Sequence, residues 1–342
     1  MTVLLEARRA TKVFGRPPRP TVALDNFSLA IDAEIPSFTA IAGESGSGKT
    51  TLARLLLGFS EPTSGEIQYR GKDLRRLSGG DWRNFRREVQ AIFQDPFEVF
   101  NPFYKVDHLL SVAIAKFHLA RSRAEARDQM ERALGAVGLR PEETLGRYPH
   151  QLSGGQRQRL TIARALLLQP RLIIADEPVS MVDASLRATI LETLRKLHLD
   201  FGISFLYITH DLTTAYQMSR NIIVLYRGSV AEAGDVDLVI KEPKHPYSQL
   251  LIASIPEPYV DERWEDAAPP TSTLDAHSAS RLGCPFADRC PFVMDQCRTV
   301  FPPLYRLDEL RVAACFLYEQ SQVLQPDELN RVLECRASPL NL

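Results

Sequence analysis

Two kinds of hydrophobic pattern alternate along the chain up to Asp235. Short, almost wholly apolar runs predict buried strands, and longer stretches with apolar residues at helical spacing predict helices. Strands are expected at 3–14, 22–31, 38–42, 66–70, 89–93, 172–175, 204–209 and 222–226. Helices are expected at 51–57, 156–168, 184–199 and 212–218. Strands that alternate with helices form a mostly parallel sheet covered on both faces, so the predicted fold class is α/β.

The pattern changes at two places and suggests how the chain is organised. Residues 106–148 read as helical throughout, which predicts a helical subdomain over about 106–155. After Asp235 the chain is punctuated by prolines, and 262–280 is a polar stretch rich in Pro, Ala and Ser that is typical of an exposed linker. We therefore expect a first domain at 1–240 and a smaller C-terminal domain at 241–342.

A phosphate-binding loop is predicted between the strand at 38–42 and the helix at 51–57. The segment Gly43-Glu44-Ser45-Gly46-Ser47-Gly48-Lys49-Thr50 matches G-x-x-x-x-G-K-[ST] at every fixed position. Its glycines allow backbone N–H groups to converge on phosphate oxygens at the positive end of a helix. Lys49 would reach the β- and γ-phosphates, and the Thr50 hydroxyl would ligate Mg²⁺.

Polar residues at the ends of other predicted strands complete a candidate catalytic site. Asp176 and Glu177 end the apolar run at 172–175, where Asp176 would hold Mg²⁺ and Glu177 would deprotonate the attacking water. Gln94 and His210 each follow a strand. Gln94 would contact Mg²⁺ and the attacking water, and His210 would contact the γ-phosphate. Alone, an acidic pair or a histidine at a strand end is commonly structural; the neighbouring phosphate loop favours the catalytic interpretation.

With these motifs in order, the chain resembles an ATP-binding subunit of an ABC (ATP-binding cassette) transporter over about residues 1–240. The matching motifs are Walker A at Gly43–Thr51, the Q-loop at Gln94, the signature at Leu152-Ser153-Gly154-Gly155-Gln156, Walker B at Leu172–Asp176 with Glu177, the D-loop at Ser180–Asp183 and the H-loop at His210. The resemblance implies an antiparallel β subdomain and a helical subdomain around the nucleotide-binding core. It also implies that Phe14 stacks on adenine, although Tyr is more usual there.

The resemblance further implies that the site is shared between two chains. In this family ATP lies between the Walker A motif of one cassette and the signature motif of another, with Ser153, Gly154, Gly155, Gln156 and Asp183 in the places of the second cassette's contacts. One copy of each motif therefore requires a second ATPase subunit, expected to be a paralogue, with a homodimer as the other option. The D-loop departs from the commoner Ser-Ala-Leu-Asp form at Met181 and Val182 but keeps Asp183.

A second resemblance covers the tail. His245-Pro246-Tyr247 and the four cysteines Cys284, Cys290, Cys297 and Cys315 resemble the C-terminal extension of the oligopeptide/dipeptide importer subfamily. That resemblance implies a [4Fe–4S] cluster on these cysteines. Four clustered thiols in a reducing compartment also suit Zn²⁺, and the alternative to any metal is that they are packing residues. Cys335 has no place in the pattern.

Composition limits the setting in which the chain works. A net charge of −1 gives no general electrostatic reason to expect binding to nucleic acid or an anionic membrane. No apolar run reaches the roughly 20 residues needed to span a bilayer. The N-terminus lacks the basic segment followed by an apolar segment that is typical of a secretory signal peptide, because charged residues begin at Glu6. We expect a cytoplasmic protein held at the cytoplasmic face of the inner membrane by partners.

These observations favour an ATPase that powers uptake of oligopeptides or dipeptides. The subfamily resemblance implies two transmembrane permease subunits and an extracytoplasmic substrate-binding protein as partners, and it leaves oligosaccharides, nickel or glutathione open as other cargoes. The competing class is a soluble ABC ATPase of DNA repair or translation. Repair members carry a long coiled coil between the nucleotide motifs and translation members carry two cassettes, and neither feature is present here. Intact Lys49, Asp176, Glu177 and His210 argue against a purely regulatory cassette.

Overall fold

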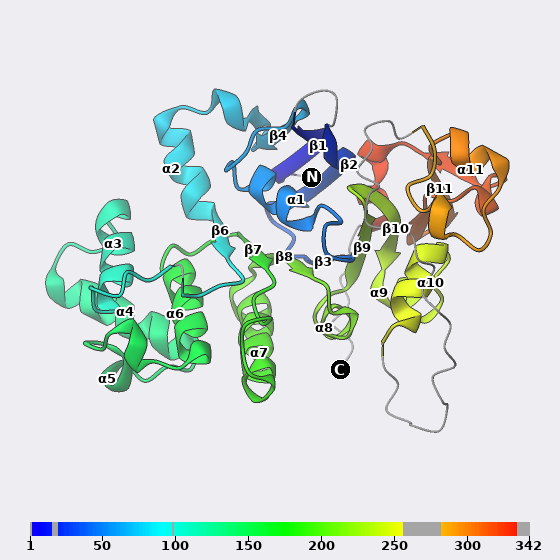
Figure 1. Cartoon of the computed structure of the whole chain (residues 1–342). Helices are drawn as coiled ribbons and strands as arrows, with labels where there is room; N and C mark the ends of the chain where they lie inside the picture. Colours follow the sequence, from blue (N-terminus) through cyan, green and yellow to red (C-terminus); the bar gives the residue numbers. More distant parts are fainter. Residues whose placement is uncertain (1, 16–19, 98, 256–281, 334–342) are drawn as a thin grey trace, which may run out of the picture. The chain divides into compact units, whose positions relative to one another are not determined.

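The computed structural model describes residues 2–15, 20–97, 99–255 and 282–333 (Figure 1). The linker predicted at 262–280 and Cys335 lie outside these residues. The chain divides into two compact units, within each of which the residues lie close to one another in space. We call Val3–Ile31, Thr39–Leu74 and Thr209–Leu342 the sheet unit, and Met1–Thr2, Asp32–Phe38 and Arg75–Ile208 the helical unit.

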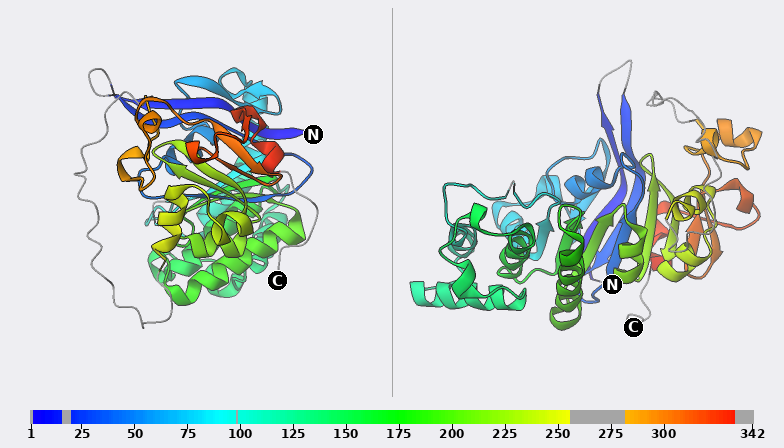
Figure 2. Two further views of the ribbon diagram at one scale, coloured as in Figure 1. Left: turned by 90° about the vertical axis from the view of Figure 1, so that its right-hand side faces the viewer. Right: turned by 60° about the horizontal axis from the view of Figure 1, so that its bottom comes forward.

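The sheet unit contains an antiparallel sheet with the strand order β2-β1-β4-β5. Its strands are β1 (Val3–Phe14), β2 (Thr21–Asp32), β4 (Ser64–Tyr69) and β5 (Lys72–Asp73). β1 and β4 pair antiparallel, with Leu5 opposite Tyr69. The long strands β1 and β2 run side by side as a ribbon (Figure 2). This sheet is the antiparallel β subdomain that the family resemblance implied.

A second sheet in this unit has the order β13-β11-β12-β10-β9-β3. Its strands are β3 (Phe38–Ala42), β9 (Asn221–Tyr226), β10 (Ser229–Asp235), β11 (Leu304–Asp308), β12 (Arg311–Ala313) and β13 (Gln322–Leu324). β3 and β9 are parallel, whereas every pairing from β9 outward to β13 is antiparallel. The extension thus lengthens the sheet with antiparallel strands that the hydrophobic pattern did not predict, because each of β11, β12 and β13 is short.

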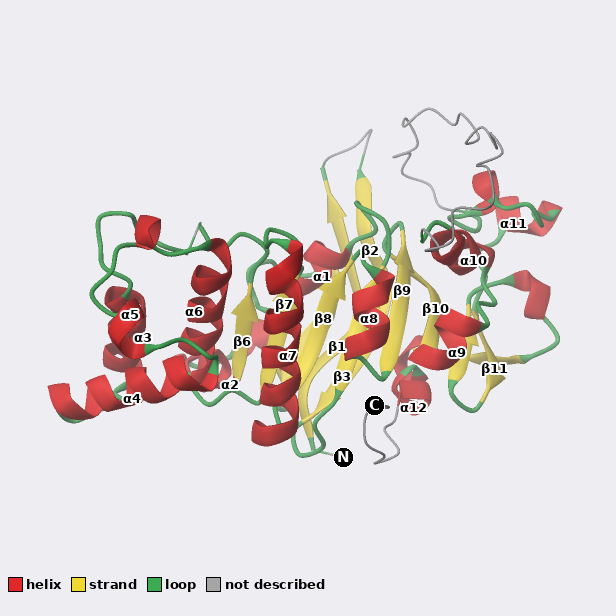
Figure 3. Ribbon diagram, turned by 90° about the horizontal axis from the view of Figure 1, so that it is seen from below, coloured by secondary structure: helices red, strands yellow, loops and turns green. Residues whose placement is uncertain are grey.

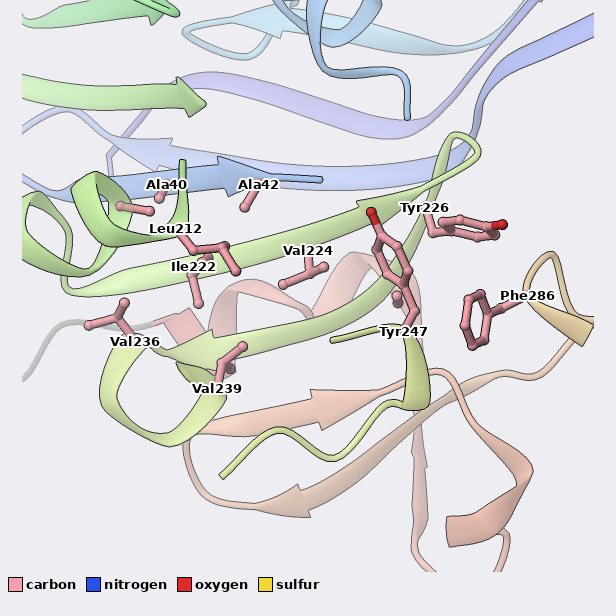
Figure 4. Close-up of a cluster of buried hydrophobic side chains, with 12 residues drawn as sticks. Ala40, Ala42, Leu212, Ile222, Val224, Tyr226, Val236, Val239, Tyr247 and Phe286 are labelled. Atoms are coloured by element: carbon pink, nitrogen blue, oxygen red, sulfur yellow. The ribbon is translucent and has the colours of Figure 1, made fainter. Parts of the chain in front are cut away.

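Helices cover this second sheet and close a hydrophobic core. The helices of the sheet unit are α1 (Lys49–Leu56), α8 (Leu212–Met218), α9 (Val236–Lys241), α10 (Pro246–Ala253), α11 (Asp295–Thr299) and α12 (Asn330–Leu333), with a 3₁₀ turn η3 (Ala287–Arg289). Buried side chains from β3, β9, α8 and α9 meet in one cluster that continues to Tyr247 of α10 and Phe286 (Figure 4). First-domain and extension residues therefore share a single core within the unit.

The helical unit is built on three parallel strands with helices beside them (Figure 3). β6 (Val89–Ile92) pairs with β7 (Leu172–Asp176), which pairs with β8 (Ser204–Thr209). The helices are α2 (Gly79–Glu88), α3 (Asp107–Phe117), α4 (Arg123–Ala136), α5 (Pro141–Thr144), α6 (Gly154–Leu166) and α7 (Ala184–Phe201). β7 and β8 are buried at every position, as their apolar runs predicted, because parallel strands are covered on both faces. Among the described residues, no helix is long and apolar enough to cross a membrane.

Candidate nucleotide-binding site

The predicted phosphate loop of the sheet unit follows a fully buried strand and opens a helix. β3 ends at Ala42, and α1 begins at Lys49 with Gly48 as its N-cap. Gly43 and Gly48 have φ values of +149° and +105°, which L side chains rarely adopt. A Cβ at Gly43 would lie 2.3 Å from the carbonyl oxygen of Leu225, and one at Gly48 would lie 2.3 Å from that of Ala23. Both positions therefore require glycine for steric as well as conformational reasons.

Inside this loop the Lys49 ammonium is held by backbone oxygens. Lys49 is only 6% exposed, and its Nζ donates hydrogen bonds to the carbonyl oxygens of Gly43 at 2.7 Å and Glu44 at 2.8 Å. The loop is also tied to the β9–β10 turn, because the Gly228 N–H donates to the Ser47 carbonyl at 2.7 Å. Ser45, Gly46 and Thr50 are exposed, and Thr51 is half-buried. The arrangement presents a buried cation and a curled backbone next to an accessible helix start, which suits a polyphosphate.

Two further predicted residues lie outside the loop. Phe14 ends β1 and is 45% exposed, with the Lys12 ammonium 5.2 Å from its ring centroid. An exposed aromatic face of this kind can stack on a nucleotide base. His210 directly follows β8, is exposed, and precedes α8, whose N-cap is Asp211.

The predicted carboxylates lie at the end of β7 in the helical unit. Asp176 is 8% exposed at the last position of the strand. Glu177 adopts φ +47°, and its N–H donates to the Ile208 carbonyl at 2.9 Å. Its own carbonyl accepts hydrogen bonds from the Ser180 N–H and hydroxyl. A left-handed conformation is unusual for a residue other than Gly, Asn or Asp, and such strain is concentrated at functional sites.

The Q-loop is linked to the residues after Glu177 by a side chain that the sequence did not single out. Gln94 is exposed and lies two residues after β6. Gln158 of α6 is completely buried, and its amide nitrogen donates to the carbonyl oxygens of Phe93 at 3.3 Å and Pro178 at 2.9 Å. The Arg157 guanidinium of the same helix lies 4.1 Å from the centroid of the Phe97 ring. Helix α6 therefore joins the segment around Gln94 to the segment after Glu177.

The signature motif forms the start of that same helix. The Ser153 hydroxyl accepts from the Gln156 N–H at 3.2 Å, and the Gln156 side chain accepts from the Ser153 N–H at 2.9 Å, so the two residues form a capping box. A Cβ at Gly155 would lie 2.8 Å from the Leu186 side chain of α7, and one at Gly154 would lie 3.9 Å from the Met181 carbonyl. Asp183, at the N-cap of α7, is exposed. The signature and D-loop thus lie side by side.

Comparison with known proteins agrees with this geometry. The family described as ABC transporter matches residues 24–180, and the oligopeptide/dipeptide transporter C-terminal region matches residues 231–297. The oligopeptide transport ATP-binding protein OppF of Salmonella typhimurium is 35% identical over 306 residues, which cover 89% of this chain and 90% of that protein. This chain belongs to the ABC transporter family. Its tail matches the oligopeptide/dipeptide branch of that family.

Other relatives and solved structures of the family are similar as well. The di/tripeptide transport ATP-binding protein DppF of Pseudomonas aeruginosa is 36% identical over 296 residues, covering 85% of this chain and 89% of that protein. The ATP-binding cassette MJ0796, solved as a dimer in a post-hydrolysis state with ADP and Pi, has a TM-score of 0.60 at 29% identity and covers 68% of this chain and 99% of that one. The predicted ABC-type α/β fold is therefore confirmed, and the chain is a transport ATPase subunit.

The predicted metal centre at the four cysteines, by contrast, is not supported. Cys284, Cys290, Cys297 and Cys315 line one cavity, but its volume of about 10 Å³ suits roughly one water molecule and not a [4Fe–4S] cluster. Among the described residues, no group of three or more His, Cys, Asp or Glu side chains is arranged to hold a metal ion, which also leaves Zn²⁺ without a site. Burial raises the pKa of Cys284 and of Cys315 to about 11, so both are protonated at neutral pH.

The structure packs three of these thiols, those of Cys284, Cys290 and Cys297, in or against hydrophobic clusters. Cys297 is 8% exposed and belongs to a small cluster with Ala287, Tyr305 and Phe316, against which Cys284 packs. The Cys284 N–H donates to the Cys297 carbonyl at 2.7 Å. The spacing alone could not distinguish these thiols from ligands, because both interpretations bring the four residues together.

Substitution Gln158→Leu tests the link between the Q-loop and the segment after Glu177. Loss of the buried amide removes its hydrogen bonds to the Phe93 and Pro178 carbonyls, so we expect a destabilisation of about 1–3 kcal/mol and slower ATP hydrolysis. Thermal unfolding and steady-state ATPase rates measure the two effects. Gln249→Leu is the matched control, because Gln249 also donates to a carbonyl, that of Pro243, but at an exposed position. Equal behaviour of the two variants would contradict the assignment.

Alkylation rates test the state of the cysteines. With pKa values near 11, Cys284 and Cys315 should react with iodoacetamide at pH 8 on the order of a hundredfold more slowly than free cysteine, and their rates should rise as the pH approaches 11. Peptide mapping by mass spectrometry after timed alkylation of the native protein measures each site. Rapid labelling at pH 7 would show that the thiolates are stabilised and would contradict the packing interpretation.

Proposed function

We propose that this chain binds and hydrolyses ATP to power the import of oligopeptides or dipeptides across the cytoplasmic membrane. The observation that carries the proposal is the phosphate loop, in which two glycines that tolerate no Cβ curl the backbone around the buried Lys49. The peptide cargo is supported by the tail, which matches the oligopeptide/dipeptide C-terminal region, and by relatives named for peptide transport. Those names favour peptides over oligosaccharides, nickel or glutathione.

In the proposed reaction each motif has one task. Lys49 and N–H groups of the Gly43–Thr51 loop other than those of Glu44 and Ser47, which already donate within the protein, bind the β- and γ-phosphates, and the exposed Phe14 ring stacks on adenine. Glu177 accepts a proton from the attacking water, Gln94 orients that water, and His210 donates a hydrogen bond to the γ-phosphate. The backbone of Glu177 is strained, and hydrogen bonds to its N–H and carbonyl groups fix it in place. This fixed backbone supports the proposal that the carboxylate accepts the proton of the attacking water.

A divalent cation completes the chemistry of this proposal. The side-chain oxygens of Thr50, Asp176 and Gln94 are hard donors of the kind that Mg²⁺ prefers, and Asp176 ends a fully buried strand. Bound Mg²⁺ would neutralise charge on the β- and γ-phosphates. Asp176 and Thr50 would bind the ion, and Gln94 of the Q-loop would contact it as well.

The proposed assembly needs several partners. A second ATPase subunit, a paralogue or a copy of this chain, would contribute its own signature motif, and the capped helix start at Ser153, Gly154, Gly155 and Gln156 would serve the partner's ATP together with Asp183. Two transmembrane permease subunits would hold the pair at the cytoplasmic face of the inner membrane. An extracytoplasmic binding protein would deliver the peptide. We also propose residues 1–240, with a helical subdomain at about 106–155, as the ATPase domain and 241–342 as the extension.

Substitution Glu177→Gln tests the catalytic part of this proposal. Removing the proton acceptor should lower the rate of ATP hydrolysis by roughly 10²–10⁴-fold while ATP binding persists. Phosphate release and equilibrium nucleotide binding measure the two quantities on the same preparation. Glu142→Gln, at an exposed position on α5, is the control. Hydrolysis by Glu177→Gln at the rate of that control would remove Glu177 from the mechanism.

A further inference from the structure

The extension contacts the phosphate loop of the same unit at Glu44. The Arg289 guanidinium, in the turn η3 beside Cys290, donates from Nη1 to Oε2 of Glu44 at 2.9 Å and from Nη2 to Oε1 at 3.0 Å. Two parallel hydrogen bonds of this kind make a bidentate pair, which fixes orientation as well as distance. The Arg289 side chain is 26% exposed and that of Glu44 39%, so the pair is partly shielded from water.

A second residue of the extension holds the backbone of Glu44. The Glu44 N–H donates to the Tyr247 hydroxyl at 2.8 Å, and the Tyr247 side chain is completely buried. On the other side of the same residue, the Glu44 carbonyl accepts from Lys49 Nζ at 2.8 Å. The extension therefore holds the carboxylate and the N–H of Glu44, while the proposed phosphate-binding lysine holds its carbonyl.

Aromatic packing explains why the two extension residues point at the loop. Tyr226 of β9, Tyr247 and Phe286 lie together at one end of the core cluster (Figure 4). The centroids of the Tyr226 and Tyr247 rings are 4.4 Å apart, and Phe286 meets Tyr226 edge-on at 5.3 Å. The Arg289 guanidinium lies 5.8 Å from the Tyr226 centroid and 5.6 Å from that of Phe286, within the range of cation–π attraction.

The His245-Pro246-Tyr247 segment is itself fixed by buried polar contacts. The His245 ring nitrogen Nδ1 accepts from the Tyr247 N–H at 3.0 Å and so caps α10, in which Pro246 is the first residue. The His245 N–H donates at 2.9 Å to the carboxylate of Glu232, which is completely buried in β10. Burial lowers the pKa of His245 to about 4, so the ring is neutral and able to accept at neutral pH.

We propose that Arg289 is a positioning residue for ATP binding, acting through Glu44 together with the Tyr247 hydroxyl. The proposal rests on the ATPase function above and assigns the extension a part in it. Arg289 keeps Glu44 oriented so that the backbone of the phosphate loop, and the Glu44 carbonyl that holds Lys49, stay in place for the β- and γ-phosphates.

Substitution Arg289→Ala in the full-length protein tests this proposal. We expect the dissociation constant for ATP and the KM for ATP to rise about fivefold, a modest factor because the pair is partly exposed, while kcat changes by less than about twofold. Arg289→Lys, which keeps the charge but loses the bidentate geometry, should recover only part of the affinity. Tyr247→Phe, which removes the hydroxyl that accepts from Glu44, should also weaken ATP binding.

Matched variants separate positioning from general damage. Arg298→Ala removes an exposed arginine of the same region, which lies 3.8 Å from Asp288, and should leave ATP affinity unchanged. In a double-mutant cycle, Glu44→Gln and Arg289→Ala together should weaken ATP binding little more than either alone, because both break one interaction. Thermal unfolding identifies any variant that fails to fold, and in that case Arg289→Lys supplies the comparison.

Two outcomes would overturn the inference. Arg289→Ala could bind ATP as tightly as Arg298→Ala, or the effects of Glu44→Gln and Arg289→Ala could simply add. Failure of the proposed function would look different, because the unaltered protein would then neither bind nor hydrolyse ATP.

Discussion

Two positions of the phosphate loop, Gly43 and Gly48, have no room for a side chain, and the path of the loop depends on this constraint. At Gly43 and Gly48 a Cβ would lie 2.3 Å from a neighbouring carbonyl oxygen, so the loop can pack against the backbone of β2 and β9 only if both residues are glycine. That close approach accompanies a curled backbone whose Gly43 and Glu44 carbonyls accept hydrogen bonds from Lys49. Nucleotide binding follows from this backbone path together with the Lys49 ammonium that it holds.

The C-terminal extension is part of the same structural unit and not an appendage. Its strands β11, β12 and β13 continue the sheet that begins at β3, and Phe286 enters the core cluster beside Tyr226. Within this unit the motifs that mark the oligopeptide/dipeptide branch act locally: His245 caps α10, Tyr247 bonds the loop backbone, and Arg289 holds Glu44. These contacts give a physical reason for a transport ATPase to carry such a tail.

Sequence reasoning predicted the elements around the nucleotide motifs well, because their patterns are strong. Fully apolar runs such as 172–175 correspond to buried parallel strands, and the phosphate-loop pattern predicted the end of β3 at Ala42 and the start of α1 to within two residues. The residues it missed act through contacts remote in sequence. Gln158 bonds carbonyls 65 and 20 residues away, and Arg289 bonds a carboxylate 245 residues away. The cysteine spacing suggested ligands, but only the size of the cavity and the burial of the thiols could argue against a metal centre.

The most direct test of the central claim is calorimetric titration of the full-length protein with Mg·ATP, comparing the natural chain with Lys49→Ala. We expect saturable binding to the natural chain and a loss of affinity on the order of tenfold or more in the variant, because the buried cation at the loop is removed. Lys116→Ala, at an exposed position of α3, should bind as the natural chain does. Absence of binding to the natural chain, or equal affinity in Lys49→Ala, would show that this loop and its lysine do not bind the nucleotide.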